Sequence, residues 1–135
     1  MHVHEHMTPS PITITGATDL QTALRLLQDR AFRRLPVTDA VGRIVGVVTE
    51  RDLLLAVSHY PSNPIDVESI MTRPVVITTP DTPLAEAAML MVGAKIGGLP
   101  VVDTDQRVVG IITESDIFRA FVGMLGAAIF SPTGE

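Results

Sequence analysis

The stretch RIVGVVTERDL at residues 43–53 returns, with conservative changes, as RVVGIITESDI at residues 107–117. The two copies lie 64 residues apart, and the same shift places LPV at 35–37 on LPV at 99–101. Over positions 7–53 the shift gives 17 identities in 47 positions without a gap. Because chance similarity does not keep one register through separate blocks, the sequence indicates a tandem duplication.

The duplication divides the chain into two units. Met7-Thr8 falls on Met71-Thr72, near the start of each copy. We predict a first unit over 5–60, a linker rich in turn formers over 61–68, and a second unit over 69–130.

Each unit repeats one order of elements, a βαββα arrangement of the mixed α/β (α+β) class. In the first unit we expect strands at 11–15, 35–39 and 43–49, with a turn at 39–42. We also expect a helix that Thr18 caps, with Gln21 completing a capping box, and a second helix that starts at Thr49. In the second unit we expect strands at 74–79, 99–103 and 107–113, with a turn at 103–106. We also expect a helix that Thr82 caps, with Pro83 at its first position, and a second helix that starts at Thr113. A small sheet with helices on one face leaves apolar surface that the other unit can cover.

The composition is that of a globular domain and excludes several classes of function. Of the 135 residues, 46% are hydrophobic and 19% are charged, enough for a core of ordinary size. The absence of cysteine excludes disulfides, thiolate zinc sites and cysteine nucleophiles. Ten basic and fifteen acidic residues give a net charge of −5, which argues against nonspecific binding to nucleic acid.

Signals for a membrane or for export are not evident. The longest apolar stretch, 121–130, is about half of the roughly 20 residues that span a bilayer. The N-terminal MHVHEHMT has neither a cationic region nor an apolar region of the kind found in signal peptides. We therefore expect a soluble cytoplasmic protein.

Taken together, these motifs resemble the CBS (cystathionine-β-synthase) domain pair, or Bateman module. The likeness covers residues 5–122. It rests on the Met-Thr pair near the start of each unit, on the two strands that contain LPV, and on the repeated segments GVVTERD at 46–52 and GIITESD at 110–116. The resemblance implies two units packed through their sheets about a pseudo-twofold axis. It also implies clefts between the units that bind AMP, ADP, ATP or S-adenosylmethionine. Nothing in this sequence looks like an attached enzyme, channel or transporter domain, so we expect a stand-alone regulatory member.

A Thr-x-x-Asp motif opens the second helix of each unit, as Thr49 with Asp52 and Thr113 with Asp116. An ionised carboxylate only accepts hydrogen bonds, so it can take both hydroxyl donors of a ribose diol in strong charge-assisted bonds. The free N–H groups of a helix start suit a phosphate or a carboxylate. The same motif is also a good helix cap by itself, and the spacing does not separate the two roles.

By resemblance, each cleft joins the Thr-Asp pair of one unit to the first strand and the loop before LPV of the other. The first cleft then combines Thr113, Asp116, Ile12, Phe32, Arg33 and Arg34. The second combines Thr49, Asp52, Val75, Ile96, Gly97 and Gly98. Backbone groups at Ile12 or Val75 would read the adenine edge, and the glycines would let a purine lie close to the backbone.

The two loops before LPV differ, because Arg33-Arg34 stands where the second unit has Gly97-Gly98. The arginines could bind phosphates bidentately, fill the pocket, or remain a solvated surface pair. We expect the clefts to differ in affinity or ligand. The first is better suited to a polyphosphate and the second to the shape of adenine.

Metal binding and catalysis have little support in the sequence. His2, His4 and His6 would lie on one side of an extended chain, where imidazoles could bind a transition metal, but no further ligand is evident and we predict no metal site. Gly-x-Ser-x-Gly, Walker, HExxH and dinucleotide motifs are absent. We therefore expect neither an enzyme nor a catalytic cofactor.

The segment 117–130 is apolar around most of its circumference and needs cover from more than one side. It could pack within the module. It could also form a homodimer together with Ala85, Ala88, Met89 and Val92, as in the disc-like dimers that the resemblance implies. We expect the homodimer.

The sequence thus favours a regulatory module in which an adenine nucleotide bridges the two units, and an unidentified protein partner senses the change in their arrangement. The alternative is a constitutive dimeric interaction protein whose clefts are empty or plugged. We expect neither a membrane nor a nucleic acid as partner.

Overall fold

The structure is a computed structural model that describes residues 1–30, 33–59 and 65–126. The predictions for Phe32, for residues 61–64 of the linker and for residues 127–130 of the C-terminal segment fall outside the described residues.

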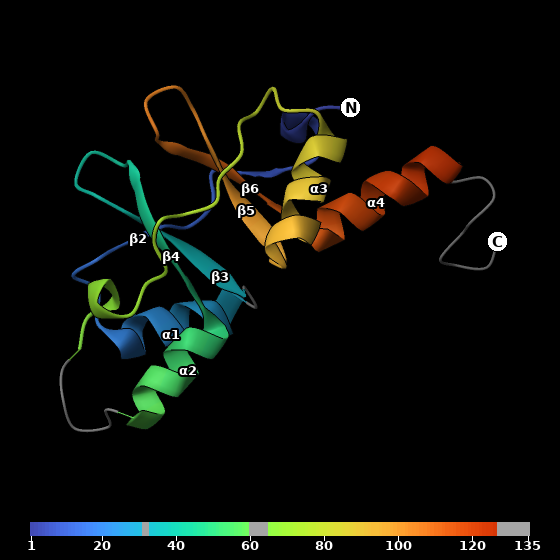
Figure 1. Cartoon of the computed structure of the whole chain (residues 1–135). Helices are drawn as coiled ribbons and strands as arrows, with labels where there is room; N and C mark the ends of the chain where they lie inside the picture. The colour runs from blue at the N-terminus through green and yellow to red at the C-terminus, as the bar shows by residue number, and fades with distance from the viewer. Residues whose placement is uncertain (31–32, 60–64, 127–135) are drawn as a thin grey trace.

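The first unit is a three-stranded sheet covered by two helices (Figure 1). Strand β2 (Ile14–Thr15) is parallel to β3 (Arg34–Thr38), which is antiparallel to β4 (Ile44–Thr49). Helices α1 (Leu20–Arg30) and α2 (Glu50–His59) lie side by side against this sheet.

The second unit repeats this arrangement. Strand β5 (Gly98–Val102) is antiparallel to β6 (Val108–Thr113), and helices α3 (Leu84–Ala94) and α4 (Glu114–Leu125) accompany them. Where the first unit has β2, the second has a single parallel bridge between Thr78 and Val101. The two units confirm the predicted mixed α/β fold of two βαββα-like halves.

Each unit has its own hydrophobic core, and the two cores use equivalent positions. Leu27 of α1 and Leu35 of β3 are fully buried in the first unit, and Leu99 of β5 is fully buried in the second. The helical spacing of apolar residues predicted this, because Leu20, Ala23 and Leu27 are the buried positions of α1.

The segment that enters each unit packs in the other unit. The turn η1 (Val3–Glu5) places fully buried Val3 in the second core, and β1 (Thr8–Pro9) pairs with β6. In the same way, η2 (Val67–Ser69) places fully buried Val67 in the first core. This crossover joins the units through their cores, and the sequence did not predict it.

Two methionines fix the crossover against glycines in the central strands. A Cβ on Gly46 would collide with the Met71 side chain, and a Cβ on Gly110 would collide with that of Met7. The glycine in each copy of the repeated β run therefore admits the methionine that enters the opposite sheet.

The two predicted turns are confirmed and touch each other across the pseudo-twofold axis. The Asp39 carboxylate accepts from the backbone N–H of Val41 and of Arg43, at 3.0 and 2.9 Å. The backbone N–H of Ile44, which begins β4 just after the first turn, donates to Gln106 O in the second turn at 2.9 Å. The bond from the Arg43 backbone, above all, holds the pKa of Asp39 below its ordinary value.

Three local predictions were wrong by small margins. Asp19, not Thr18, accepts from the backbone N–H of Thr22 at the start of α1, at 2.7 Å, and this bond lowers the pKa of Asp19. Pro83 is the N-cap of α3, one residue after the predicted cap, and the hydroxyl of Thr82 pairs with that of Thr79 at 2.7 Å. The first strands at 11–15 and 74–79 are shorter than predicted, with pairing at Ile14 and Thr15 in the first unit and at Thr78 in the second.

Candidate functional site

Asp116 lies at the start of α4 and is 4% exposed. Its Oδ2 accepts from the Thr113 backbone N–H at 2.9 Å and from the Thr113 hydroxyl at 3.0 Å. The Thr113 hydroxyl in turn faces the Asp116 backbone N–H at 3.4 Å, which completes a capping box. The capping role that the motif suggested is therefore present in the second unit.

The second oxygen of this carboxylate has a partner that the sequence analysis did not single out. Arg119, one turn further along α4, donates from its guanidinium to Asp116 Oδ1 at 2.6 Å. The Arg119 side chain is 71% exposed, so only Asp116 is removed from solvent in this pair. The spacing of three residues on one helix was the signal that could have found it.

The first unit has the same capping box without the arginine. Asp52 Oδ2 accepts from the Thr49 backbone N–H at 3.1 Å, and the Asp52 N–H donates to the Thr49 hydroxyl at 3.1 Å. The position equivalent to Arg119 is Leu55, which is 53% exposed. Asp52 is also less deeply buried than Asp116.

A cleft of about 440 Å³ opens between the two units, next to the second capping box. It brings together Ile12, Arg33 and Arg34 from the first unit and Thr113 from the second, as predicted for the first cleft. The other lining residues are Thr8, Pro11, Pro36, Gly97, Ile111, Glu114, Ser115 and Phe118. Asp116, which was predicted for the same cleft, is not among its lining residues, because its carboxylate is buried within the capping box.

Several of these lining residues were missed by sequence reasoning. Thr8 reaches the cleft because its strand crosses to the second sheet, which no local pattern indicates. Glu114, Ser115 and Phe118 lie on the first turn and a half of α4. Their proximity to the Thr113 motif could have indicated them, since residues three and four apart share a helix face.

Arg34 lies across the pseudo-twofold axis from its own repeat equivalent, Gly98. Its guanidinium donates to Gly98 O at 3.4 Å, and a Cβ on Gly98 would lie 3.1 Å from Arg34 Nε. A Cβ on Gly97 would lie 2.5 Å from Glu114 Oε1 and 2.8 Å from an Arg34 nitrogen. The two glycines therefore make room for this arginine and this glutamate.

The half-buried Arg34 guanidinium has an unusual electrostatic environment for an arginine. Burial lowers its pKa, the nearby Glu114 carboxylate opposes this, and Arg33 adds to the lowering. Within residues 1–30, 33–59 and 65–126, the partner of this guanidinium is the Gly98 carbonyl, at a long distance of 3.4 Å. The cleft wall thus holds a partly desolvated cation with weak hydrogen-bond partners.

The residues predicted for the second cleft are placed differently. Thr49 and Asp52 form their capping box, and Val75 is half-buried. Gly97, however, lines the first cleft, and the side of Gly98 on which a Cβ would stand faces Arg34. Ile96 lines a separate groove between α3 and α4 in the second unit. The close approach that the glycines permit is made here by Arg34.

Two of the N-terminal histidines stack on each other and use their ring nitrogens in local contacts. The His2 and His4 rings stack with centroids 5.8 Å apart, His2 Nδ1 lies 3.3 Å from Glu5 Oε1, and His4 Nδ1 lies 2.9 Å from Pro80 O. Over residues 1–30, 33–59 and 65–126, no three His, Cys, Asp or Glu side chains are grouped to hold a metal ion.

The model of the CBS domain family matches residues 3–59 and again residues 67–123. The chain belongs to the CBS domain family. The CBS pair is 37% identical over 134 residues to a CBS domain-containing protein of Dictyostelium discoideum, over 91% of this chain and 92% of that protein. It is 36% identical over 121 residues to the L-aspartate semialdehyde sulfurtransferase of Methanocaldococcus jannaschii, over 90% of this chain but 23% of that enzyme. The chain therefore spans nearly the whole of the first relative and less than a quarter of the second.

Solved structures confirm the fold. A CBS domain pair in complex with 5'-methylthioadenosine and S-adenosyl-L-methionine is 35% identical, with a TM-score of 0.83 over 92% of this chain and 98% of that one. CBSX2 of Arabidopsis thaliana in complex with AMP is 31% identical, with a TM-score of 0.82 over 92% of this chain and 98% of that one.

Among the helices of the described residues, none is long and apolar enough to cross a bilayer.

Proposed function

We propose that this CBS pair is a regulatory module that binds an adenine nucleotide in the cleft lined by Arg33, Arg34 and Thr113. The observation that carries the proposal is the position of Arg34, a half-buried cation in a cleft that both units line. Related CBS pairs that bind AMP or S-adenosylmethionine support the class of ligand.

The phosphates of the ligand would lie against the two arginines. A partly desolvated guanidinium gains more from an anion than an exposed one, and its planar fork suits phosphate oxygens. Glu114 opposes a large anionic charge, but its carboxylate can turn away because Glu114 is exposed. This arrangement favours ADP or ATP over AMP in the first cleft.

The base and the ribose would lie beside the phosphates. Pro11, Ile12, Pro36, Ile111 and Phe118 supply apolar surface for adenine. Asp116 would take ribose hydroxyls through Oδ1, the oxygen that Arg119 now covers. We propose that Arg119 turns from Asp116 towards the ligand, which its exposure allows.

The proposed role is binding without catalysis. The Thr113 hydroxyl donates to Asp116 within the helix cap, so it is held as a structural group rather than activated as a nucleophile. A ligand that touches both units can bias their relative arrangement, provided that its affinity differs between two arrangements. We propose that a protein partner reads this bias, and that the module acts as a homodimer.

The test is a thermal-shift series with AMP, ADP, ATP, S-adenosylmethionine and NAD, followed by calorimetry. At a hundredfold excess over its dissociation constant, a true ligand adds about 2.7 kcal/mol of stability, enough to raise the midpoint by several degrees. Arg34→Ala should weaken binding of ATP on the order of tenfold to a hundredfold. The matched variant Arg25→Ala, which removes an exposed arginine of α1 that does not line the cleft, should leave that binding unchanged.

One observation favours the rival function, a constitutive interaction module with plugged clefts. Asp116 is already satisfied by Thr113 and Arg119, and Arg34 already lies against Gly98. Absence of any shift with all five ligands would support this rival and end the nucleotide proposal.

A further inference from the structure

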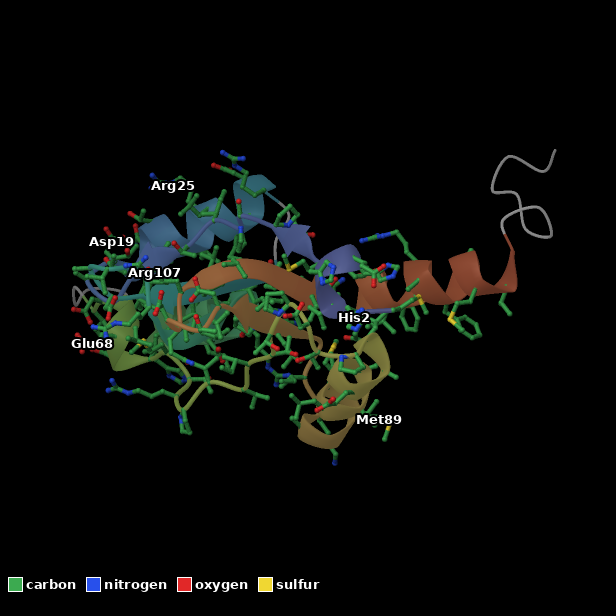
Figure 2. The ribbon with its side chains drawn as sticks, turned by 90° about the horizontal axis from the view of Figure 1, so that it is seen from above. His2, Asp19, Arg25, Glu68, Met89 and Arg107 are labelled. Carbon is green, nitrogen blue, oxygen red and sulfur yellow. The ribbon has the colours of Figure 1, made fainter. Side chains whose placement is uncertain are left out.

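The nucleotide cleft is lined by one acidic side chain as well as by basic ones. Arg33 and Arg34 line it from the first unit, and Glu114 lines it from the start of α4. Figure 2 shows a different position for Arg25, whose side chain lies on the outside of α1. The charges that a ligand meets in the cleft are therefore those of the loop before β3 and of the first turn of α4.

Glu114 and Arg34 approach the same small space. The backbone N–H of Glu114 donates to Gly97 O at 3.0 Å, which fixes the start of α4 against this loop. A Cβ on Gly97 would lie 2.5 Å from Glu114 Oε1 and 2.8 Å from Arg34 Nη2. Among the ion pairs within 4.0 Å that join described residues, none links these two groups. The cleft thus presents an anion and a cation side by side, and each can still take a partner of opposite charge.

The repeat shows that this placement belongs to the second unit. Glu50 stands at the position of Glu114, and its backbone N–H makes the same bond, to Arg33 O at 3.0 Å. Arg33, however, stands where the second unit has Gly97, so a Cβ takes up the corresponding space. Glu50 is also not among the lining residues of the cleft. It offers the same chemistry in the other unit, without the contact.

A metal-free polyphosphate makes poor use of the Glu114 carboxylate. The arginines attract phosphate oxygens, whereas the carboxylate repels them. Turning Glu114 away relieves the repulsion, but a ligand that carries its own cation converts it into attraction. Mg²⁺ prefers oxygen ligands and is usually bound by one or two carboxylates together with the phosphates of a ligand, while it keeps several waters.

The protein by itself does not provide a magnesium site in the part of the chain that the structure describes. No three His, Cys, Asp or Glu side chains are grouped there to hold a metal ion. One carboxylate is too few ligands for this ion, so the phosphates must supply others. The hydroxyl groups of Thr8 and Ser115, which also line the cleft, could contact the waters that the ion keeps.

We propose that the cleft recognises a nucleoside di- or triphosphate in its magnesium-bound form. Glu114 faces the metal ion of the ligand, directly or through its waters, and Arg34 faces the phosphate oxygens. Glu114 is then the residue that separates magnesium-bound from metal-free nucleotides. This inference rests on the proposed function and names the form of its ligand.

The test is calorimetry with ATP, once with excess Mg²⁺ and once with EDTA. For the wild type we expect binding tighter on the order of tenfold with Mg²⁺, a typical coupling between two ligands. Glu114→Gln keeps the size of an exposed side chain and removes its charge. This variant should bind metal-free ATP more tightly than the wild type does, and it should lose most of the gain from Mg²⁺. Glu50→Gln is the matched control and should behave as the wild type in both conditions.

A second measurement follows the metal directly. With Mn²⁺ in place of Mg²⁺, water-proton relaxation reports whether the bound nucleotide keeps its ion. We expect a relaxation change when ATP, Mn²⁺ and the wild type are mixed, and a smaller one with Glu114→Gln. The wild type with Mn²⁺ alone should give no change, because the protein by itself lacks the other ligands.

Each outcome decides one part of the proposal. Equal or tighter binding of ATP in EDTA overturns the role of the metal and leaves the proposed function intact. The same magnesium gain in Glu114→Gln overturns the assignment to Glu114. Metal-free binding of S-adenosylmethionine that Glu114→Gln weakens would mean that the carboxylate pairs with an ammonium group, and it would also overturn the proposal. No binding of ATP in either condition ends the proposed function, and this inference with it.

Discussion

The two units of this chain are alike inside and different outside. Leu35 and Leu99 are both fully buried at equivalent positions of β3 and β5. Outside the cores, Arg34 faces Gly98, and Arg25 of α1 stands where α3 has Met89. After the duplication, the core positions kept their chemistry while the cleft and the outer helix faces diverged. The difference between the units therefore marks the surfaces with a function more clearly than either unit does alone.

The largest expected effect tests whether the cores are equivalent. Leu35→Ala and Leu99→Ala each leave a cavity in a fully buried site, so each should lower the free energy of unfolding by about 2–5 kcal/mol. Urea unfolding measures both, and the two losses should agree within about 1 kcal/mol. A much larger difference would contradict the equivalence of the two cores.

The capping boxes should differ in strength. Asp52→Ala removes one cap and should cost about 1 kcal/mol of unfolding free energy. Asp116→Ala also removes the bond from Arg119, so it should cost about 2 kcal/mol. Guanidinium unfolding of both variants measures the difference, and Arg119→Gln is the control, since it should account for the excess. Equal losses would show that the arginine adds nothing to stability.

A smaller effect is expected where the two loops meet. A Cβ at position 98 would lie 3.1 Å from the carbonyl oxygen of Ile112 and 3.1 Å from Arg34 Nε. Gly98→Ala should therefore cost about 1 kcal/mol of unfolding free energy, since the backbone oxygen cannot move away easily. In an Arg34→Ala background the cost should fall, and a double-mutant cycle measures the coupling. Full additivity would mean that the arginine does not press on this glycine.

Much of the fold follows from the sequence, and particular residues show where the inference stopped. The repeat, the buried helix positions and the Asp39 turn follow from periodicity and local hydrogen bonding, which act over a few residues. The family resemblance grouped Ile12, Arg33, Arg34 and Thr113, and these four residues line one cleft of the structure, whereas Asp116 of the same group is not among the lining residues. The crossover of Val3 and the position of Thr8 depend on contacts far apart in sequence, which local patterns do not encode.

The smallest effect concerns pH and the Asp39 turn. Hydrogen bonds to the Asp39 carboxylate lower its pKa below the ordinary 3.8, so its contribution is present above that value and is lost as the pH falls through the folded value. Asp39→Asn should therefore have a lower thermal midpoint than the wild type at neutral pH, and the gap should close in acid. Thermal unfolding from about pH 7 to about pH 3 measures it. A gap that does not change with pH would contradict this reading.

Val3 completes the hydrophobic core of the second unit, and Val67 completes that of the first. A single repeat therefore cannot complete its own hydrophobic core. Two separate half-length chains would therefore have to exchange these leading segments to complete both cores. We expect a proteolytic nick between residues 59 and 65 to leave two fragments that stay clasped in native buffer, and that separate only when both are denatured.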